Sequence, residues 1–128
     1  MIEVIRAFRM KRFAVVVTAE PEYDTDLSWD ETGETARRLD SGDLIAFQVK
    51  AAVYLDGNEI GADYLGGCIY ESLADFMDHR ECGKQNRMYT RAGEAGRCGS
   101  YFADMIGAAI GEARKYVKAL KPVYVRAA

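Results

Sequence analysis

Residues 45–65 read IAFQVKAAVYLDGNEIGADYL, and this stretch alone predicts a pair of antiparallel strands. Along residues 44–55, apolar residues occupy every second position, and the positions between them form a second face. This period of two is that of a half-buried strand. Asp56-Gly57-Asn58 follows at once, and Asp-Gly favours the primed turns that join antiparallel strands. Residues 59–65 then return as the partner strand. We therefore expect a β-hairpin here, with Gly66-Gly67 ending or bending its second strand.

More strand is expected on the N-terminal side of the hairpin. Residues 13–18, FAVVVT, are apolar and β-branched, which predicts a strand buried on both faces or nearly so. The apolar stretch at the N-terminus is short and runs directly into Thr18, Ala19 and Glu20. We therefore interpret it as a strand and not as a signal peptide. Met10-Lys11-Arg12 resembles a second start site, and we interpret residues 1–9 as an N-terminal extension.

Two short helices are expected, one on each side of the hairpin. The first covers residues 32–39, with Thr32 as its N-cap and Ser41-Gly42 as its stop. The second follows Ser72, which caps the run LADFMDH.

The longest helix is expected to begin at Ser100 and to run to about Leu120, where Pro122 stops it. Its apolar residues recur at helical spacing, at positions 102, 106, 109, 110, 113, 117 and 120. Residues 123–125 then read as a short edge strand. The expected fold class is α+β: an antiparallel sheet of three or four strands with one long C-terminal helix packed on a face, in a single domain of residues 1–128.

Composition excludes several classes of protein. The chain has 128 residues, which is enough for one domain with a real core. Its net charge of −3 argues against general binding of nucleic acid, which needs a basic balance. No apolar run approaches the length that spans a membrane. Three cysteines, an odd and sparse number, fit free thiols in a reducing cytoplasm.

The acidic segment, residues 20–34, is the most unusual part of the chain, because it holds seven carboxylates and no basic residue. It also contains Tyr23 and the single tryptophan, Trp29. Opposite potentials speed and orient docking, so a segment of this kind fits the basic surface of another protein. A solvated loop has the same composition. The expected partner-binding residues are Tyr23, Asp24, Asp26, Trp29, Asp30 and Glu31.

Small residues recur every four positions along one side of the long helix, at Ala103, Gly107 and Gly111. Each glycine costs roughly 1 kcal/mol relative to alanine inside a helix, so a gain elsewhere is expected. Tight packing of the helix on the sheet is one explanation. The other is a helix–helix seam in a homodimer.

Chemistry by a metal or a bound phosphate has weaker support. The soft metal ligands are Cys68, His79, Cys82 and Cys98, which form one close pair where structural zinc sites usually have two. Gly93, Gly96 and Gly99 precede the long helix, but their spacing matches no phosphate-binding motif. We therefore expect no cofactor, no metal and no enzymatic activity. The basic residues between 79 and 97 are either a mobile connection or a second contact site.

Several segments between Met10 and Lys115 share one style, with no catalytic motif among them: FAVVVTAEPE, DLSWDETGE, SGDL, AVYLDGNEIGADYLGGCIYES and GSYFADMIGAAIGEARK. In these segments the chain resembles the small accessory proteins of bacterial temperate phages and other mobile elements, which include the anti-CRISPR proteins. The resemblance implies an inhibitor in the bacterial cytoplasm that binds a host nucleoprotein complex, such as a CRISPR effector. It assigns no residue a role, because the class shares no motif.

Overall fold

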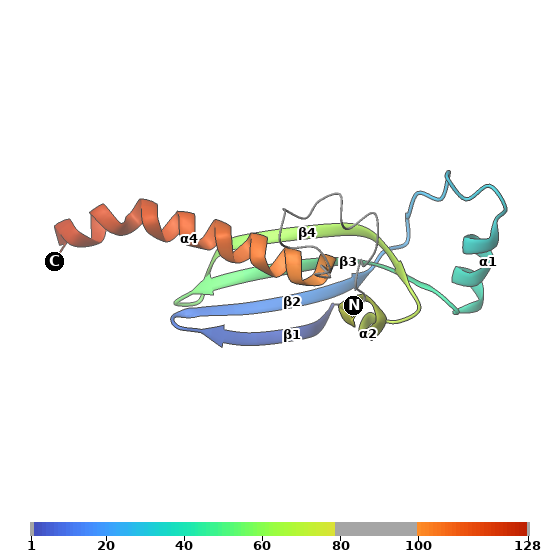
Figure 1. Ribbon diagram of the computed structural model, residues 1–128, viewed down its shortest axis with the longest axis horizontal. Coiled ribbons are helices and arrows are strands. Elements are labelled where there is room, and N and C mark those ends of the chain that lie inside the picture. The colour runs from blue at the N-terminus through green and yellow to red at the C-terminus, as the bar shows by residue number, and fades with distance from the viewer. Residues whose placement is uncertain (1, 79–99, 128) are drawn as a thin grey trace, which may run out of the picture.

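The computed structural model describes residues 2–78 and 100–127, with side chains up to residue 120 (Figure 1). In chain order the elements are β1 (Glu3–Met10), β2 (Phe13–Pro21), α1 (Glu34–Ser41), β3 (Ile45–Leu55), β4 (Asn58–Tyr70), α2 (Leu73–Asp78) and α4 (Tyr101–Ala127). The four strands form one antiparallel sheet in the order β1-β2-β3-β4, and α4 packs on one face of it. The expected α+β class is therefore confirmed.

The predicted hairpin is present as β3 and β4. Asp56 and Gly57 take φ values of 51° and 82°, so both central residues of the turn are left-handed, as a type I′ turn requires. Gly67 has φ 67° and lies where the register between β3 and β4 shifts, so the glycine pair bends β4 without ending it. The strand then continues to Tyr70.

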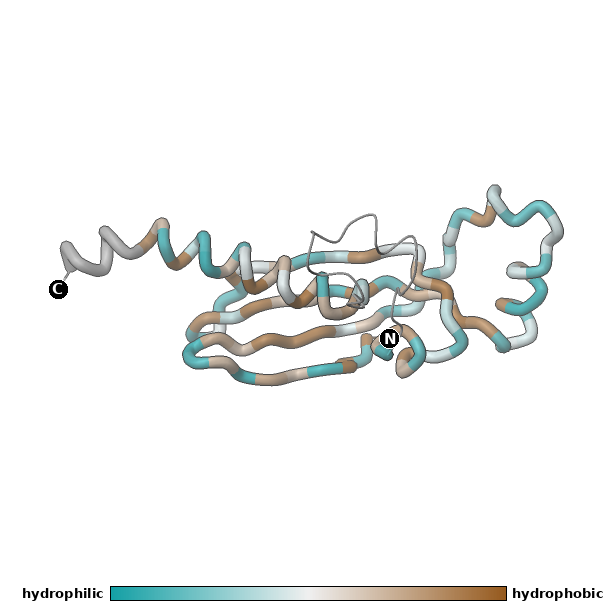
Figure 2. The backbone as a smooth tube through the Cα atoms, in the orientation of Figure 1, coloured by the Kyte–Doolittle hydropathy of each residue, from teal (hydrophilic) through white to brown (hydrophobic). Residues whose placement is uncertain are grey.

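The core lies between α4 and one face of the sheet. Val15, Val17, Val49 and Val53 are almost completely buried there, and Figure 2 shows the apolar residues running along the two central strands. The expectation that residues 13–18 are buried on both faces is wrong. Every second residue of β2 is only half-buried, because α4 covers one side of the sheet.

Gly61 of β4 is where α4 comes closest to the sheet. A Cβ atom built on Gly61 would lie 2.5 Å from the carbonyl oxygen of Ala109 and 2.7 Å from the amide nitrogen of Ala113. The packing interpretation of Ala103, Gly107 and Gly111 is therefore wrong. Among residues 2–78 and 100–127, no atom lies within 4 Å of such a Cβ atom on Gly107 or Gly111, because both glycines face away from the sheet, and Ala103 is exposed.

The expected caps of the C-terminal helices are confirmed. The Ser100 hydroxyl accepts a hydrogen bond from the N–H of Ala103 at 3.0 Å, and the Ser72 hydroxyl accepts one from Asp75 at 3.0 Å. Within residues 2–78 and 100–127, no helix is long and apolar enough to cross a membrane.

The expected stop at Pro122 is wrong, and so is the edge strand at residues 123–125. Helix α4 continues through both to Ala127. Proline removes one N–H donor from a helix interior and is unfavourable there, yet α4 does not end at it. Figure 1 shows why no strand forms here: this end of α4 projects past the sheet, where no strand lies beside it.

Candidate partner-binding surface

The acidic segment lies at the end of the molecule opposite the projecting end of α4 (Figure 1). Its first two residues finish β2, residues 22–33 form a loop, and Glu34 begins α1. The loop is long, yet a series of hydrogen bonds within it and to the sheet holds its conformation. These bonds determine which of the predicted side chains are free to contact a partner.

Glu22 attaches the loop to the sheet. Its N–H donates to the carbonyl oxygen of Ala46 at 3.0 Å, which continues the pairing of β2 with β3. Its carboxylate Oε1 accepts a hydrogen bond from the Thr25 hydroxyl and another from the N–H of Gly67, each at 3.1 Å. One side chain thus connects the loop to β4. Glu22 is not among the residues predicted from the sequence, because only the folded sheet brings residue 67 beside it.

The middle of the loop is a local turn built on Asp26. The N–H of Ser28 donates to the Asp26 carboxylate at 2.9 Å, and the indole N–H of Trp29 donates to the Asp26 carbonyl oxygen at 3.0 Å. The bonds from Ser28 lower the pKa of Asp26 below its ordinary value. The turn therefore holds the indole ring in place while 60% of Trp29 stays exposed.

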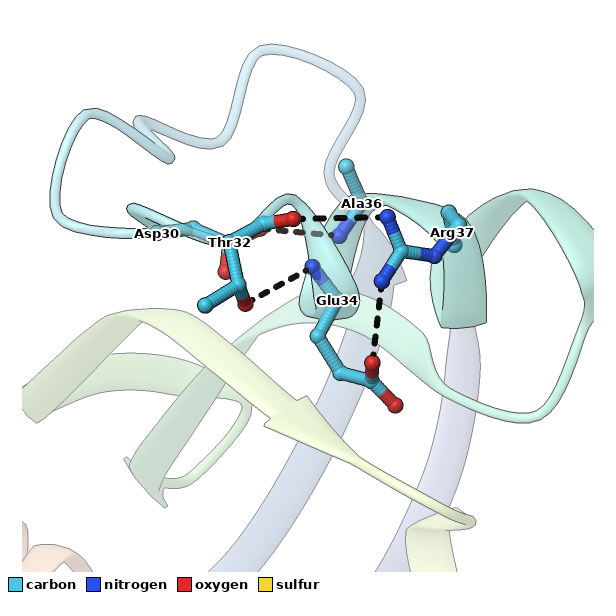
Figure 3. A network of polar contacts seen from close by, with 5 residues as sticks. All are labelled: Asp30, Thr32, Glu34, Ala36 and Arg37. Atoms are coloured by element: carbon cyan, nitrogen blue, oxygen red, sulfur yellow. Dashed lines mark hydrogen bonds and ion pairs between the residues drawn. The ribbon is translucent and has the colours of Figure 1, made fainter.

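Asp30 connects the loop to α1, as Figure 3 shows. Its Oδ2 accepts a hydrogen bond from the N–H of Ala36 at 3.1 Å. The Thr32 hydroxyl accepts one from Glu34 at 3.3 Å. Thr32 was expected to be the N-cap of this helix, and that expectation is wrong. The N-cap is Gly33, with φ 73°. The N–H of Ala36, in the first turn of the helix, is satisfied by the side chain of Asp30, six residues earlier.

The predicted stop of α1 at Ser41-Gly42 is confirmed. Gly42 takes φ 87° and donates its N–H to the carbonyl oxygen of Leu39, so the helix ends in a left-handed residue. It therefore covers Glu34–Ser41 and not residues 32–39.

The six predicted partner-binding residues thus divide into two groups. Asp26 and Asp30 stabilise the loop itself. Asp24 and Glu31 are exposed, and their carboxylates make no hydrogen bond or ion pair with any described residue. Tyr23 is 88% exposed. The surface that a partner could touch therefore consists of two aromatic side chains and two unpaired carboxylates.

Two clefts adjoin this surface. The acidic cleft, about 440 Å³, lies beside Trp29 and is lined by the carboxylate residues Glu22, Asp24 and Asp26. The apolar cleft, about 620 Å³, lies between α1 and the end of the sheet. Its apolar lining includes Leu27, Leu39, Leu44, Ile45, Phe47 and Leu73, with Glu20 and Asp40 also on its wall.

The chemistry of the acidic cleft fits a cationic group. A lysine or arginine side chain over an aromatic ring is attracted by the ring's quadrupole, and carboxylates accept its N–H groups. The apolar cleft has the size and lining of a ligand pocket and fits an apolar side chain. Together the clefts match a protein segment that combines basic and apolar residues.

Of the four possible soft metal ligands, only Cys68 lies among the described residues. Cys68 is buried and its thiol donates to the carbonyl oxygen of Leu65 at 3.7 Å. Burial, and then the negative charge of Glu22, raise the pKa of Cys68 to about 11, so the thiol stays protonated at neutral pH. A protonated, buried thiol is a poor metal ligand. His79, Cys82 and Cys98, like Gly93, Gly96, Gly99 and the basic residues of segment 79–97, lie outside the described residues.

Comparison of the chain with known protein families, with characterised proteins and with solved structures finds no match.

Proposed function

We propose that the protein acts by binding another protein, and that the acidic segment occupies a basic, nucleic-acid-binding surface of a host nucleoprotein complex. This is the mode of action that the resemblance to anti-CRISPR inhibitors implies, and its setting is the bacterial cytoplasm. The observation that carries the proposal is a loop, ordered by its own hydrogen bonds, that carries two exposed aromatic side chains, Tyr23 at 88% and Trp29 at 60%.

Exposed aromatic residues on a fixed loop favour binding for an energetic reason. Tyrosine and tryptophan bring a large contact area at little cost in side-chain entropy, and they dominate the energetics of many interfaces. A loop that is already ordered loses little further freedom when it binds. The contacts of Glu22 to Thr25 and Gly67, and of Asp26 to Ser28, supply that order here.

The charges determine the kind of partner. Asp24 and Glu31 have no described cation beside them, so a basic surface would meet them unpaired. A groove that holds nucleic acid carries lysine and arginine for its phosphates. Carboxylates bound in such a groove neutralise those cations and exclude the nucleic acid. A basic side chain entering the acidic cleft would lie against Trp29 between carboxylates.

Intrinsic fluorescence tests this proposal directly, since Trp29 is the only tryptophan of the chain. We expect titration with a purified CRISPR effector complex, or with an arginine-rich peptide as a minimal probe, to shift or quench the Trp29 emission. We expect an equally long glutamate-rich peptide to leave the emission unchanged. Binding of the effector's target DNA should fall as the protein is added, when measured by gel shift.

Variants at the exposed side chains should weaken the complex without unfolding the loop. We expect Trp29→Ala to lower affinity about tenfold to a hundredfold, followed by pull-down, and Asp24→Asn with Glu31→Gln to lower it less. The matched controls are Tyr116→Ala and Asp104→Asn, which change an exposed aromatic and an exposed acid on α4. Unchanged binding in the Trp29 variant, or an equal loss in the α4 variants, would contradict the proposal.

A further inference from the structure

The face of the sheet opposite α4 is uncovered in the described structure, and its composition is unusual for a face in water. An antiparallel sheet with one solvated face normally alternates apolar residues inward with polar residues outward. Here the outward positions of the central strands include Ala14, Val16 and Tyr54, which are partly exposed, and Ala52, which is only 3% exposed. Exposed apolar residues continue the face at the edges, where Val4 is 58% and Tyr64 67% exposed.

The strand register arranges this face in rows that run across all four strands. The middle row is small and apolar throughout: Ala7, Val16, Ala52 and Ala62. One flanking row is Arg9, Ala14, Tyr54 and Glu59, and the other is Val4, Thr18, Lys50 and Tyr64. The small row therefore lies as a shallow trough between longer side chains.

The geometry points to a second copy of this chain as the partner of the face, in a two-fold symmetric dimer that packs sheet on sheet. A two-fold axis parallel to the strands, between β2 and β3, places β1 over β4 of the other copy and β2 over β3. Each row then meets its own copy in reverse order. An interface of this kind is isologous, so one patch has to complement itself.

The middle row satisfies that requirement in size, and the row that begins at Arg9 satisfies it in charge and in size. Reversal places Arg9 opposite Glu59 of the other copy, and it does so twice in the dimer. It places Ala14 opposite Tyr54 and Val16 opposite Ala52, so that a small residue meets a larger one near the axis. Sheets that pack face to face cross at about 30°, so the match is closest at these central positions.

The charges within the face leave one basic group unmatched. Lys50 is paired with Glu59 of its own chain at 2.6 Å and lies over the Tyr64 ring at 5.4 Å. Arg9 has no ion pair with any described residue. Contact with the other copy would bring the carboxylate of Glu59 to it. This inference does not depend on the function proposed for the acidic segment.

Sedimentation equilibrium over a series of protein concentrations tests the dimer. We expect a monomer–dimer equilibrium for the unmodified chain. Arg9→Glu and Glu59→Arg each place like charges opposite one another and should weaken the dimer about tenfold, whereas the double variant should recover most of the loss. Ala7→Glu should abolish the dimer, because it places an unpaired charge in the apolar row. Circular dichroism checks that each variant is folded.

Gly107→Leu serves as the control on the opposite side of the molecule, since it blocks the alternative seam along α4 without touching this face. We expect it to leave the dimer intact. A chain that is monomeric at every concentration overturns the inference. So does a dimer that Gly107→Leu disrupts and Ala7→Glu does not, which would assign self-association to Ala103, Gly107 and Gly111 instead. Failure of the double variant to recover would overturn the proposed axis.

Discussion

Replacing Phe76 by alanine should lower the free energy of unfolding by about 3–5 kcal/mol, as large-to-small changes of a buried aromatic residue do. Phe76 is 1% exposed, and it is the only buried residue of the short helix α2, whose Leu73 and Met77 pack against the core at its margin. Its ring meets those of Phe47, Tyr70 and Phe102 at centroid distances of 5.5, 5.2 and 6.0 Å, all close to edge-to-face. Alanine would leave a cavity where β3, β4, α2 and α4 come together.

Urea unfolding followed by far-ultraviolet circular dichroism measures this effect. The control is Tyr101→Ala, which removes a neighbouring aromatic side chain that is 50% exposed and should change stability by no more than about 0.5 kcal/mol. A loss below about 1 kcal/mol for Phe76→Ala would show that the aromatic cluster is not a central part of the core.

Glycine-to-alanine changes at positions 61 and 107 should have opposite signs. At Gly61 the new methyl group would meet the backbone of α4 at Ala109 and Ala113, so the helix would have to move off the sheet. We expect a loss of about 1–3 kcal/mol or more, because backbone atoms cannot turn aside as a flexible side chain can. At Gly107 the methyl group meets nothing, and the better helix propensity should stabilise the protein by up to about 1 kcal/mol.

Thermal unfolding of the two variants side by side gives the comparison, with the unmodified chain as reference. The chemical change is identical at both positions, so the difference combines the close contact at Gly61 with the gain in helix propensity at Gly107. Destabilisation at Gly107 comparable to that at Gly61 would contradict the arrangement in which α4 contacts β4 through Ala109 and Ala113.

The acidic segment shows how far a sequence can predict a site. Its charge and its aromatic residues were evident without a structure, and Tyr23, Asp24, Trp29 and Glu31 do lie exposed on one loop. The separate roles of the carboxylates were not evident, because Asp30 bonds to a residue six positions away and Glu22 to one forty-five positions away. A count of charges treats all of them alike.

Local patterns in the sequence determined much of the secondary structure of this protein and the class of its fold, although the stop at Pro122 and the edge strand after it were wrong. Alternation along residues 44–55, the Asp56-Gly57 turn and the serine caps at Ser72 and Ser100 depend on neighbours in the chain, so their physical causes are visible in the sequence.

Only the tertiary structure decided which surfaces are covered. The sequence does not distinguish the glycines of α4 from the glycine of β4. In the structure, Gly61 permits the close approach of the helix, while Gly107 and Gly111 face away from the sheet. The outward face of β2 reads as core, but one helix can cover only one side of a sheet. Burial depends on how distant segments pack together, and patterns of neighbouring residues do not contain those contacts.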